Sequence, residues 1–306
     1  RHRVSRIYWH GKFFDYPVSL KPQTLKNMGF IQTMKVGFSY LKSLIHKLPE
    51  DNLENFYINR FGKALYGMFF EGYTEKLWGR HPSVISADWG SQRVKGISIM
   101  AVLKDAWGKL VGKEKKAGEG ETSLIEEFWY PKFGPGQLWE TVAKHDEEFG
   151  AHIMHAEVVK INETAEGKIA SVVYRDSEGH EQTLAGDEFI SSMPVKDLVD
   201  SIAAGDQATK PVPSDMKKIA DGLPYRDFVT VGFLVDHLNL KNETDVPTLG
   251  NPQIVPDCWI YVQDTSVKVG RIQVFNNWSP YLVQDVDNKV WIGLEYFCNE
   301  GDAFWE

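Results

Sequence analysis

Residues Gly72–Gly79 read G-Y-T-E-K-L-W-G and are the most informative stretch of the chain. The stretch combines two large aromatic side chains, a hydroxyl group, both signs of charge and a glycine at each end. It follows an apolar helical pattern that we expect to end near Glu71, with Gly72 as the stop signal. We therefore predict that Tyr73–Trp78 is a loop held by a rigid scaffold, a setting in which functional side chains are frequent.

Helical periodicity dominates the chain before this stretch. Residues 23–47 carry apolar side chains at three-to-four spacing, and a second such helix follows an expected N-cap at Asp51. The first twenty residues instead alternate like strands around a turn at 10–12, which predicts a hairpin. Further helices are expected near 83–90 and 93–110, before a Gly- and Lys-rich exposed loop at 111–122.

Strand patterns dominate the second half of the chain, after a helix expected at 137–148, and a short helix is expected from Ser214. The predicted strands are 128–130, 152–161, 168–175, 181–184, 188–192, 227–236, 258–263, 270–276 and 290–297. Helices first and strands later indicate an α+β fold, because a βαβ protein would alternate the two. The later sheet is expected to be mixed or antiparallel.

Length and composition fit a globular protein with one large core or two smaller ones, since 42% of its 306 residues are hydrophobic and 25% are charged. We divide the chain into three parts. They are a helical substrate-binding part with the N-terminal hairpin at 1–122, a strand–helix–hairpin part that supports a cofactor at 123–200, and a sheet of the substrate domain at 201–306.

The charge pattern favours a small-molecule substrate over a nucleic acid. The net charge is −8, and no block of Lys and Arg is large enough for a nucleic-acid interface. No apolar run is long enough to span a membrane, whereas peripheral membrane contact and the oligomeric state stay open. Cys258 and Cys298 are the only cysteines, which excludes a disulfide framework, and we expect a reducing cytoplasm.

Several familiar site motifs are absent from the sequence. It contains no Gly-x-Gly-x-x-Gly, no P-loop, no His-Glu-x-x-His and no Gly-x-Ser-x-Gly. His152 and His155 are three residues apart, so in the strand predicted for them they would face opposite sides. We therefore predict no metal site.

Two interpretations of Tyr73 and Trp78 are open from the residues alone. They either close the core as an apolar plug or form a stacking platform, since flat aromatic side chains bind flat rings at small entropic cost. Arg93, further along, either holds a phosphate in a bidentate fork or forms a surface salt bridge. Residues 275–280 and 295–297 could belong either to a sheet that faces the substrate or to one that packs against the core. We favour a packing role.

Gly72–Gly79 resembles the G-Y-T-x-K-x-W-G signature of UDP-galactopyranose mutases and of the related protoporphyrinogen oxidase and amine oxidase-like flavoproteins. The resemblance implies substrate-binding residues at Tyr73, Thr74, Trp78 and Arg93. In the mutases, this loop and a downstream arginine bind the uridine and the diphosphate. Leu77 stands where mutases usually have Gln, and the residues before Arg93 also differ, which weighs against sugar-nucleotide specificity.

A second segment, Tyr130–Leu138, resembles the Pro-x-Gly-Gly-x-x-x-Leu turn of the protoporphyrinogen oxidase and amine oxidase group, although alone it is also a simple glycine turn. A helix, Val158–Ile161, a hairpin at Gly167 and Ile190–Pro194 follow in the order of that group. The resemblance implies an FAD site, with the backbone of Val158 at the adenine. The implied cofactor-binding residues are Gly134, Gly136, Val158, Ser192 and Pro194.

We interpret the chain as an internal fragment of an FAD-dependent oxidoreductase of this superfamily. The dinucleotide-binding fingerprint of the family would precede residue 1, so we expect the fragment alone to be inactive and to bind FAD weakly or not at all. No catalytic acid or base is assigned. Two alternatives stay open: a flavin-dependent isomerase similar to UDP-galactopyranose mutase, and a non-catalytic binding module.

Overall fold

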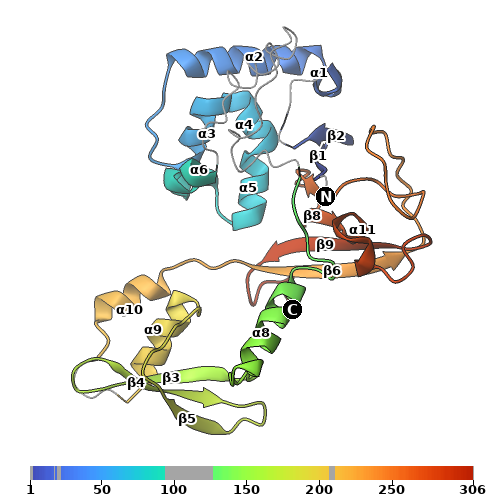
Figure 1. Ribbon diagram of the computed structural model, residues 1–306. Helices are drawn as coiled ribbons and strands as arrows, with labels where there is room; N and C mark the ends of the chain where they lie inside the picture. Colours follow the sequence, from blue (N-terminus) through green and yellow to red (C-terminus); the bar gives the residue numbers. More distant parts are fainter. Residues whose placement is uncertain (1–2, 17, 19–21, 94–126, 207–210, 306) are drawn as a thin grey trace, which may run out of the picture. The chain divides into compact units, whose positions relative to one another are not determined.

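A computed structural model of the chain describes residues 3–16, 18, 22–93, 127–206 and 211–305. The fold is α+β, as predicted, and it divides into two compact units (Figure 1). Unit 1 comprises Arg1–Leu138 with Arg226–Glu306, and unit 2 comprises Trp139–Tyr225. The helix predicted at 93–110 and the loop at 111–122 lie almost entirely outside the described residues, and the three-part division of the chain stays a prediction.

Unit 1 contains a six-stranded sheet in the order β2-β1-β7-β8-β9-β6. Its strands are β1 (Ser5–Trp9), β2 (Lys12–Asp15), β6 (Asp227–Val235), β7 (Trp259–Val262), β8 (Val269–Val274) and β9 (Val290–Cys298). The predicted hairpin of β1 and β2 is confirmed. The sheet is mixed, because β1 runs parallel to β7 while the other neighbours are antiparallel.

Helices and 3-10 turns make up much of the rest of unit 1. They are α1 (Pro22–Met28), α2 (Phe30–Ile45), α3 (Leu53–Phe61), α4 (Lys63–Phe69), α5 (Glu71–Trp78), α6 (Ala87–Arg93) and α11 (Phe275–Trp278), with 3-10 turns η1 (Pro82–Val84) and η3 (Pro280–Leu282). The single helix expected at 23–47 is broken at Gly29, whose φ of 78° leaves the helical region. The N-cap of α3 is Asn52, which accepts the backbone N–H of Asn55, and not Asp51 as predicted.

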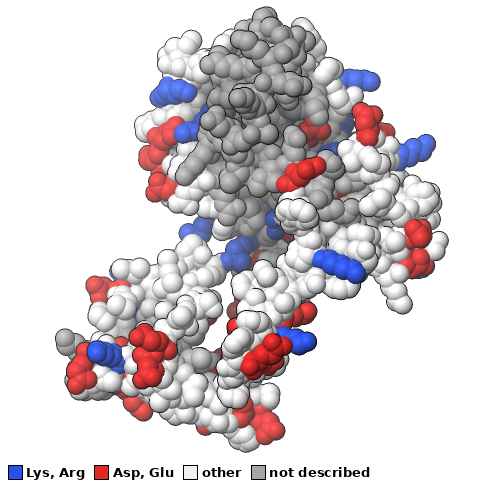
Figure 2. Space-filling model, in the orientation of Figure 1, with Lys and Arg blue, Asp and Glu red and all other residues white. Residues whose placement is uncertain are grey.

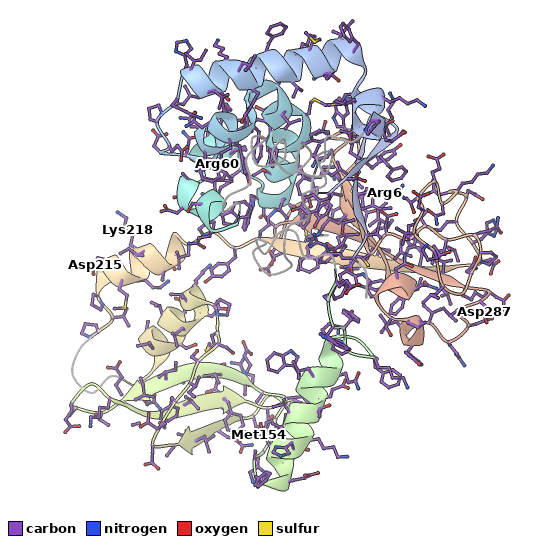
Figure 3. The ribbon with its side chains drawn as sticks, turned by 45° about the horizontal axis from the view of Figure 1, so that its top comes forward. Arg6, Arg60, Met154, Asp215, Lys218 and Asp287 are labelled. Atoms are coloured by element: carbon purple, nitrogen blue, oxygen red, sulfur yellow. The ribbon has the colours of Figure 1, made fainter. Side chains whose placement is uncertain are left out.

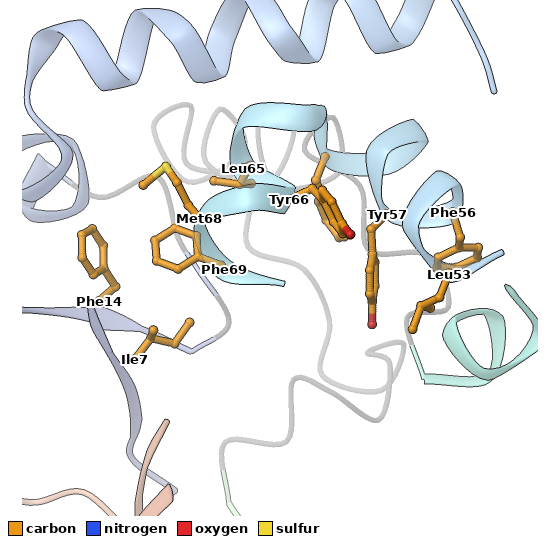
Figure 4. Packing of buried hydrophobic residues seen from close by; sticks show 10 residues of the cluster. Ile7, Phe14, Leu53, Phe56, Tyr57, Leu65, Tyr66, Met68 and Phe69 are labelled. Atoms are coloured by element: carbon orange, nitrogen blue, oxygen red, sulfur yellow. The ribbon is translucent and has the colours of Figure 1, made fainter. Parts of the chain in front are cut away.

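Two apolar cores lie on opposite faces of the sheet. The first packs α3 and α4 against β1 and β2, as Figure 4 shows for Phe14, Tyr66 and Phe69. The second includes Ile260 and Val274 on the other face. Neighbouring side chains of a strand point to opposite faces, so Tyr261 turns toward the helices while Ile260 turns away from them. This alternation decides which strand residues face α5.

Unit 2 is built on a three-stranded antiparallel sheet in the order β3-β4-β5. Its elements are β3 (Glu157–Glu163), β4 (Ile169–Arg175), β5 (Glu181–Ala185), α9 (Val195–Ala204), α10 (Ser214–Asp221) and most of α8 (Gly136–Glu148). Helix α9 packs on β3. The predicted strands at 168–175 and 181–184 and the helices at 137–148 and from Ser214 are confirmed within a residue or two.

Three strand predictions require correction. The strand expected at 152–161 begins only at Glu157, so His152 and His155 precede it. Residues 188–192 form no strand, and Ile190 is fully exposed. Residues 128–130 join no ladder either, and Phe128 and Tyr130 pack their rings on Trp278. Short apolar runs fit a strand and a packed loop equally well.

The surface carries both signs of charge. On the face shown in Figure 2, acidic and basic side chains are interspersed over the described residues. Within the described segments, no helix has the combined length and apolar character that crossing a bilayer requires.

Candidate functional site

The G-Y-T-E-K-L-W-G stretch forms helix α5, and the prediction of a loop was wrong. Helix α5 runs from Glu71 to Trp78, and Gly79 ends it in the left-handed conformation with φ of 63°. Gly72 lies inside the helix, where an added Cβ would come within 3.0 Å of the Thr265 methyl group. Gly72 is therefore explained by close packing of α5 on the turn between β7 and β8, and not by a helix stop.

Lys76 connects α5 by hydrogen bonds to the turn between β7 and β8 and to the strand ends beside it. Its ammonium group donates hydrogen bonds to the backbone carbonyl oxygens of Val262 at 3.0 Å, Asp264 at 2.7 Å and Val269 at 3.1 Å. Burial lowers the pKa of Lys76, against the opposing effect of the Asp264 carboxylate. The lysine of the motif thus fixes the helix that carries Tyr73 relative to β7 and β8.

Tyr73 projects from α5 onto the aromatic face of the sheet. Its ring meets the ring of Tyr261 edge-on at 5.8 Å, and Tyr261 lies 4.5 Å from the ring of Tyr16. Burial raises the pKa of Tyr73 and of Tyr261, although Arg271 acts in the opposite direction on both. Both phenols therefore stay protonated at neutral pH and can act as hydrogen-bond donors to a ligand.

An ion pair lies on the same face. Nε of Arg271 donates to Oε2 of Glu295 at 2.5 Å, and Gln273 donates to the other oxygen of that carboxylate. The guanidinium lies over the rings of Trp259 and Phe297, 5.8 and 5.3 Å from their centroids. We define the Tyr73 face as Tyr73, Tyr261, Trp259, Arg271, Glu295 and Phe297.

Trp78 lies at the C-terminal end of α5 and is 36% exposed. Its ring meets that of Trp89 on α6 edge-on at 5.5 Å. Thr74, by contrast, is buried. Arg93 is the last residue of α6, and its side chain lies outside the described part of the structure. The predicted substrate residues Tyr73, Thr74 and Trp78 therefore share one helix, with Arg93 ending another.

Arg226 meets the end of α5. An added Cβ at Gly79 would lie 3.1 Å from its guanidinium, and Nη2 of Arg226 donates to the carbonyl of Phe297 at 3.1 Å. Its Nε is buried and has no hydrogen-bond partner among the described residues. A cation at this position stabilises the C-terminal end of a helix.

The predicted cofactor residues are distributed over both units. In unit 1, Gly134 is buried with φ of 91° and Gly136 begins α8. In unit 2, Val158 is half-buried in β3, next to a bulge that separates its pairing from that of Lys160. Ser192 and Pro194 are exposed, and the carbonyl of Pro194 accepts the N–H of Leu198 in the first turn of α9.

A cavity of about 500 Å3 lies elsewhere in unit 1. Residues of α2, α4, the start of α5 and both hairpin turns line it, among them His10, Gln32, Tyr66, Glu71 and Gln263. Tyr73 and Trp78 are not among its lining residues. The cavity is therefore separate from the Tyr73 face.

Sequence reasoning missed Tyr261, Arg271 and Glu295 as parts of the site and favoured simple packing for residues 295–297. The alternation of β7 and β8 was the available signal, because Tyr261 pairs with Arg271 across the two strands. This alternation identifies site residues only when it is known which face of the sheet meets α5. No group of three or more potential metal-ligating His, Cys, Asp or Glu side chains occurs within the described segments.

Comparisons with known proteins give structural matches only. No protein-family model and no curated protein matches the sequence. The fold is similar to that of a reduced UDP-galactopyranose mutase, with 18% identity and a TM-score of 0.69 over 98% of this chain and 57% of that chain. It is also similar to a putative protoporphyrinogen oxidase from Exiguobacterium sp. 255-15, with 10% identity and a TM-score of 0.58 over 97% of this chain and 59% of the other.

A third similar structure is an oxidoreductase from Methanosarcina mazei, with 10% identity and a TM-score of 0.55 over 98% of this chain and 60% of the other. The chain thus spans less than two thirds of the length of each of these three proteins. At these identities the matches establish the likeness of fold.

Proposed function

We propose that this chain is the substrate-binding region, with part of the cofactor support, of a longer FAD-dependent oxidoreductase of the protoporphyrinogen oxidase and amine oxidase-like superfamily. The observation that carries the proposal is the position of Tyr73. The motif that resembles the flavoprotein signature forms a helix fastened by Lys76, and it turns Tyr73 toward Tyr261 and Arg271. The similar folds of the three solved proteins support the same assignment.

The residues of unit 2 fit part of a flavin dinucleotide site. Among the described strands β3 is an edge of its sheet, so alternate backbone groups along β3 point away from β4. The bulge between Val158 and Lys160 also leaves Val159 without a partner in the ladder. We propose that Val158 contacts the adenine through its backbone and that Ser192 and Pro194 run beside the dinucleotide. Gly134 and Gly136, which belong to unit 1, are proposed separately as cofactor-binding residues, because glycine lets a backbone approach a ligand closely.

The chemistry in this proposal comes from the flavin, which accepts a hydride from a substrate carbon next to nitrogen. The chain itself binds and orients the substrate. The protonated phenols of Tyr73 and Tyr261 donate hydrogen bonds, and the rings around them exclude water. Glu295 is buried in an ion pair, so its role is to hold Arg271 in place and not to transfer protons. Trp78 and Arg93 extend the binding surface beyond Tyr73.

A second function, that of an isomerase similar to UDP-galactopyranose mutase, is supported by two observations. The mutase has the highest TM-score of the three proteins compared. In addition, Arg271 places a positive charge beside several aromatic side chains, which suits the diphosphate and base of a sugar nucleotide. A non-catalytic binding module is the third candidate, and absence of flavin from the full-length protein would favour it.

Ligand titrations of the full-length protein distinguish these functions. We expect the flavin absorbance to be perturbed either by UDP-galactose under reducing conditions, as for a mutase, or by amines or porphyrin precursors, as for an oxidoreductase. Tyr73→Phe should weaken the binding of whichever ligand perturbs the flavin absorbance. Tyr296→Phe is the matched control, since Tyr296 neighbours Glu295 on the opposite face of β9. Equal effects of the two variants, or no perturbation by any ligand, would contradict the proposal.

A further inference from the structure

Helix α2 turns its apolar side outward. Seven large apolar side chains are exposed along its 16 residues, with Phe30 80%, Phe38 65% and Ile45 77% exposed. Figure 3 shows side chains standing on the outer side of this helix. We call these seven residues the outer stripe: Phe30, Ile31, Met34, Phe38, Leu41, Leu44 and Ile45.

The inner side of α2 is comparatively polar and fixes the helix to α4. The hydroxyl of Ser39 accepts the backbone N–H of Ala64 at 2.9 Å, and Gln32 donates to the sulfur of Met68 at 3.0 Å. Gly62 approaches the backbone so closely that an added Cβ would lie 2.7 Å from the nitrogen of Tyr40. A surface helix ordinarily buries its apolar stripe, so an exposed stripe of this length indicates an interaction site.

The charge of this segment differs from that of the chain. Residues 16–49 contain five lysines and one histidine but no acidic residue, whereas the whole chain has a net charge of −8. Lys35 and Lys42 are exposed, and neither forms an ion pair with a residue that the structure describes. At 100° per residue, both fall on the same flank of the outer stripe.

We propose that α2 is an interfacial helix that docks the protein on an anionic lipid membrane. The outer stripe enters the boundary between head groups and acyl chains, while Lys35 and Lys42 meet the lipid phosphates. At 1.5 Å per residue the helix is about 24 Å long, too short to cross the hydrocarbon core, so it lies in the plane of the membrane.

Charge complementarity favours this partner over a second copy of the chain. Residues 16–49 offer no carboxylate to the lysines of another copy. In an antiparallel pair of helices, the flank with Lys35 and Lys42 would face the same flank of its partner, and like charges would meet. An anionic membrane supplies an apolar layer for the stripe and negative charge for its flank.

The test is co-sedimentation of the full-length protein with two kinds of vesicle, phosphatidylcholine alone and phosphatidylcholine mixed with phosphatidylglycerol. We expect binding to the mixed vesicles, weakened by salt. Lys35→Glu/Lys42→Glu should reduce binding by more than about tenfold, and Phe38→Gln/Leu41→Gln should also reduce it. The charge-matched control is Lys144→Glu/Lys218→Glu, on α8 and α10 (Lys218 is labelled in Figure 3).

All four substituted α2 side chains are exposed, so the variants should retain the wild-type far-ultraviolet circular dichroism spectrum. The proposal is overturned if the mixed vesicles bind no protein, or if the control weakens binding as much as the α2 variants do. It is also overturned if sedimentation shows a dimer that Phe38→Gln/Leu41→Gln dissociates, because the outer stripe would then be an interface between two copies.

Discussion

The side chain of Arg271 is held by that of Glu295, with Nε and Oε2 2.5 Å apart. Glu295 is 3% exposed, whereas the Arg271 side chain is 26% exposed. The buried carboxylate therefore orients a cation that remains accessible beside Tyr73. This relationship makes the Tyr73 face a preformed surface, because an arginine with a fixed direction loses less side-chain entropy on binding a ligand.

Removing one member of this pair should destabilise the protein strongly. Arg271→Met leaves the Glu295 carboxylate buried without its cation, and we expect a loss of about 3–5 kcal/mol in the free energy of unfolding. Arg271→Met/Glu295→Leu should lose clearly less, since no charge is then left unpaired. Urea unfolding of wild type, Arg271→Met, Glu295→Leu and the double variant measures these values. A double variant that loses the sum of the two single effects would show that the residues do not act as a pair.

Trp78 should matter more for binding than for stability. Trp78→Ala removes a side chain that is 36% exposed and its edge-on contact with Trp89, so we expect a smaller destabilisation than at a fully buried aromatic site, together with a clear loss of ligand affinity. Phe56→Ala, at a buried core position, provides the reference for emptying an aromatic site and should cost about 3–5 kcal/mol. If Trp78→Ala costs as much as Phe56→Ala, Trp78 is a plug of the core and not a ligand platform.

Lys76 should be a major determinant of the position of α5. Lys76→Met leaves three backbone carbonyls without their ammonium donor, and we expect a loss of about 2–3 kcal/mol in the free energy of unfolding. Lys63→Met, at an exposed position of α4, is the matched control and should change stability little. Chemical denaturation checks both, and equal effects of the two substitutions would disprove the role assigned to Lys76.

Asp176 should make the stability of unit 2 depend on pH. Its carboxylate accepts the backbone N–H groups of His180 and Glu178, which together with Gln182 lower its pKa below the ordinary value of 3.8. The folded state therefore binds this proton less readily than the unfolded state does. The contribution is present above pH 3.8 and is lost as the pH falls through the lowered pKa.

Asp176→Asn should accordingly reduce stability at neutral pH, and its difference from wild type should shrink on acidification below pH 3.8. Thermal unfolding at a series of pH values measures this. Asp187→Asn, at an exposed position after β5, is the control and should show no such trend. A difference between Asp176→Asn and wild type that stays constant across the acid range would contradict the assignment.

The elements of the fold could largely be predicted from local patterns. The alternation of β6 and β9 and the periodicity of α3, α4 and α8 are visible in the sequence. However, α3 and α4 were expected to form one helix, and the break at Gly62, whose φ is 77°, was not predicted. The parallel pairing of β1 with β7 could not be predicted, because it joins residues about 250 positions apart through backbone bonds that leave no pattern. The outward direction of the α2 stripe also contradicts the usual rule that an apolar face is buried.

The candidate site, too, could be predicted only in part, because contacts between distant residues leave no local pattern. Gly72 suggested a helix end, since glycine usually destabilises helices. Its actual constraint is the Thr265 methyl group 3.0 Å from the position of a Cβ, a contact made by a turn almost 200 residues later. Tyr73 could be singled out from its motif, whereas Arg271 and Glu295 became recognisable only when the strand register placed them on the same face.

The visible absorbance spectrum of the purified full-length protein tests most directly the proposal that this chain is part of a flavoprotein. We predict a flavin band, with FAD released in roughly equimolar amount when the protein is denatured. The isolated 306-residue chain should retain little or no FAD under the same conditions. A full-length protein that shows no flavin band, and that retains no FAD after incubation with an excess of it, would contradict the account.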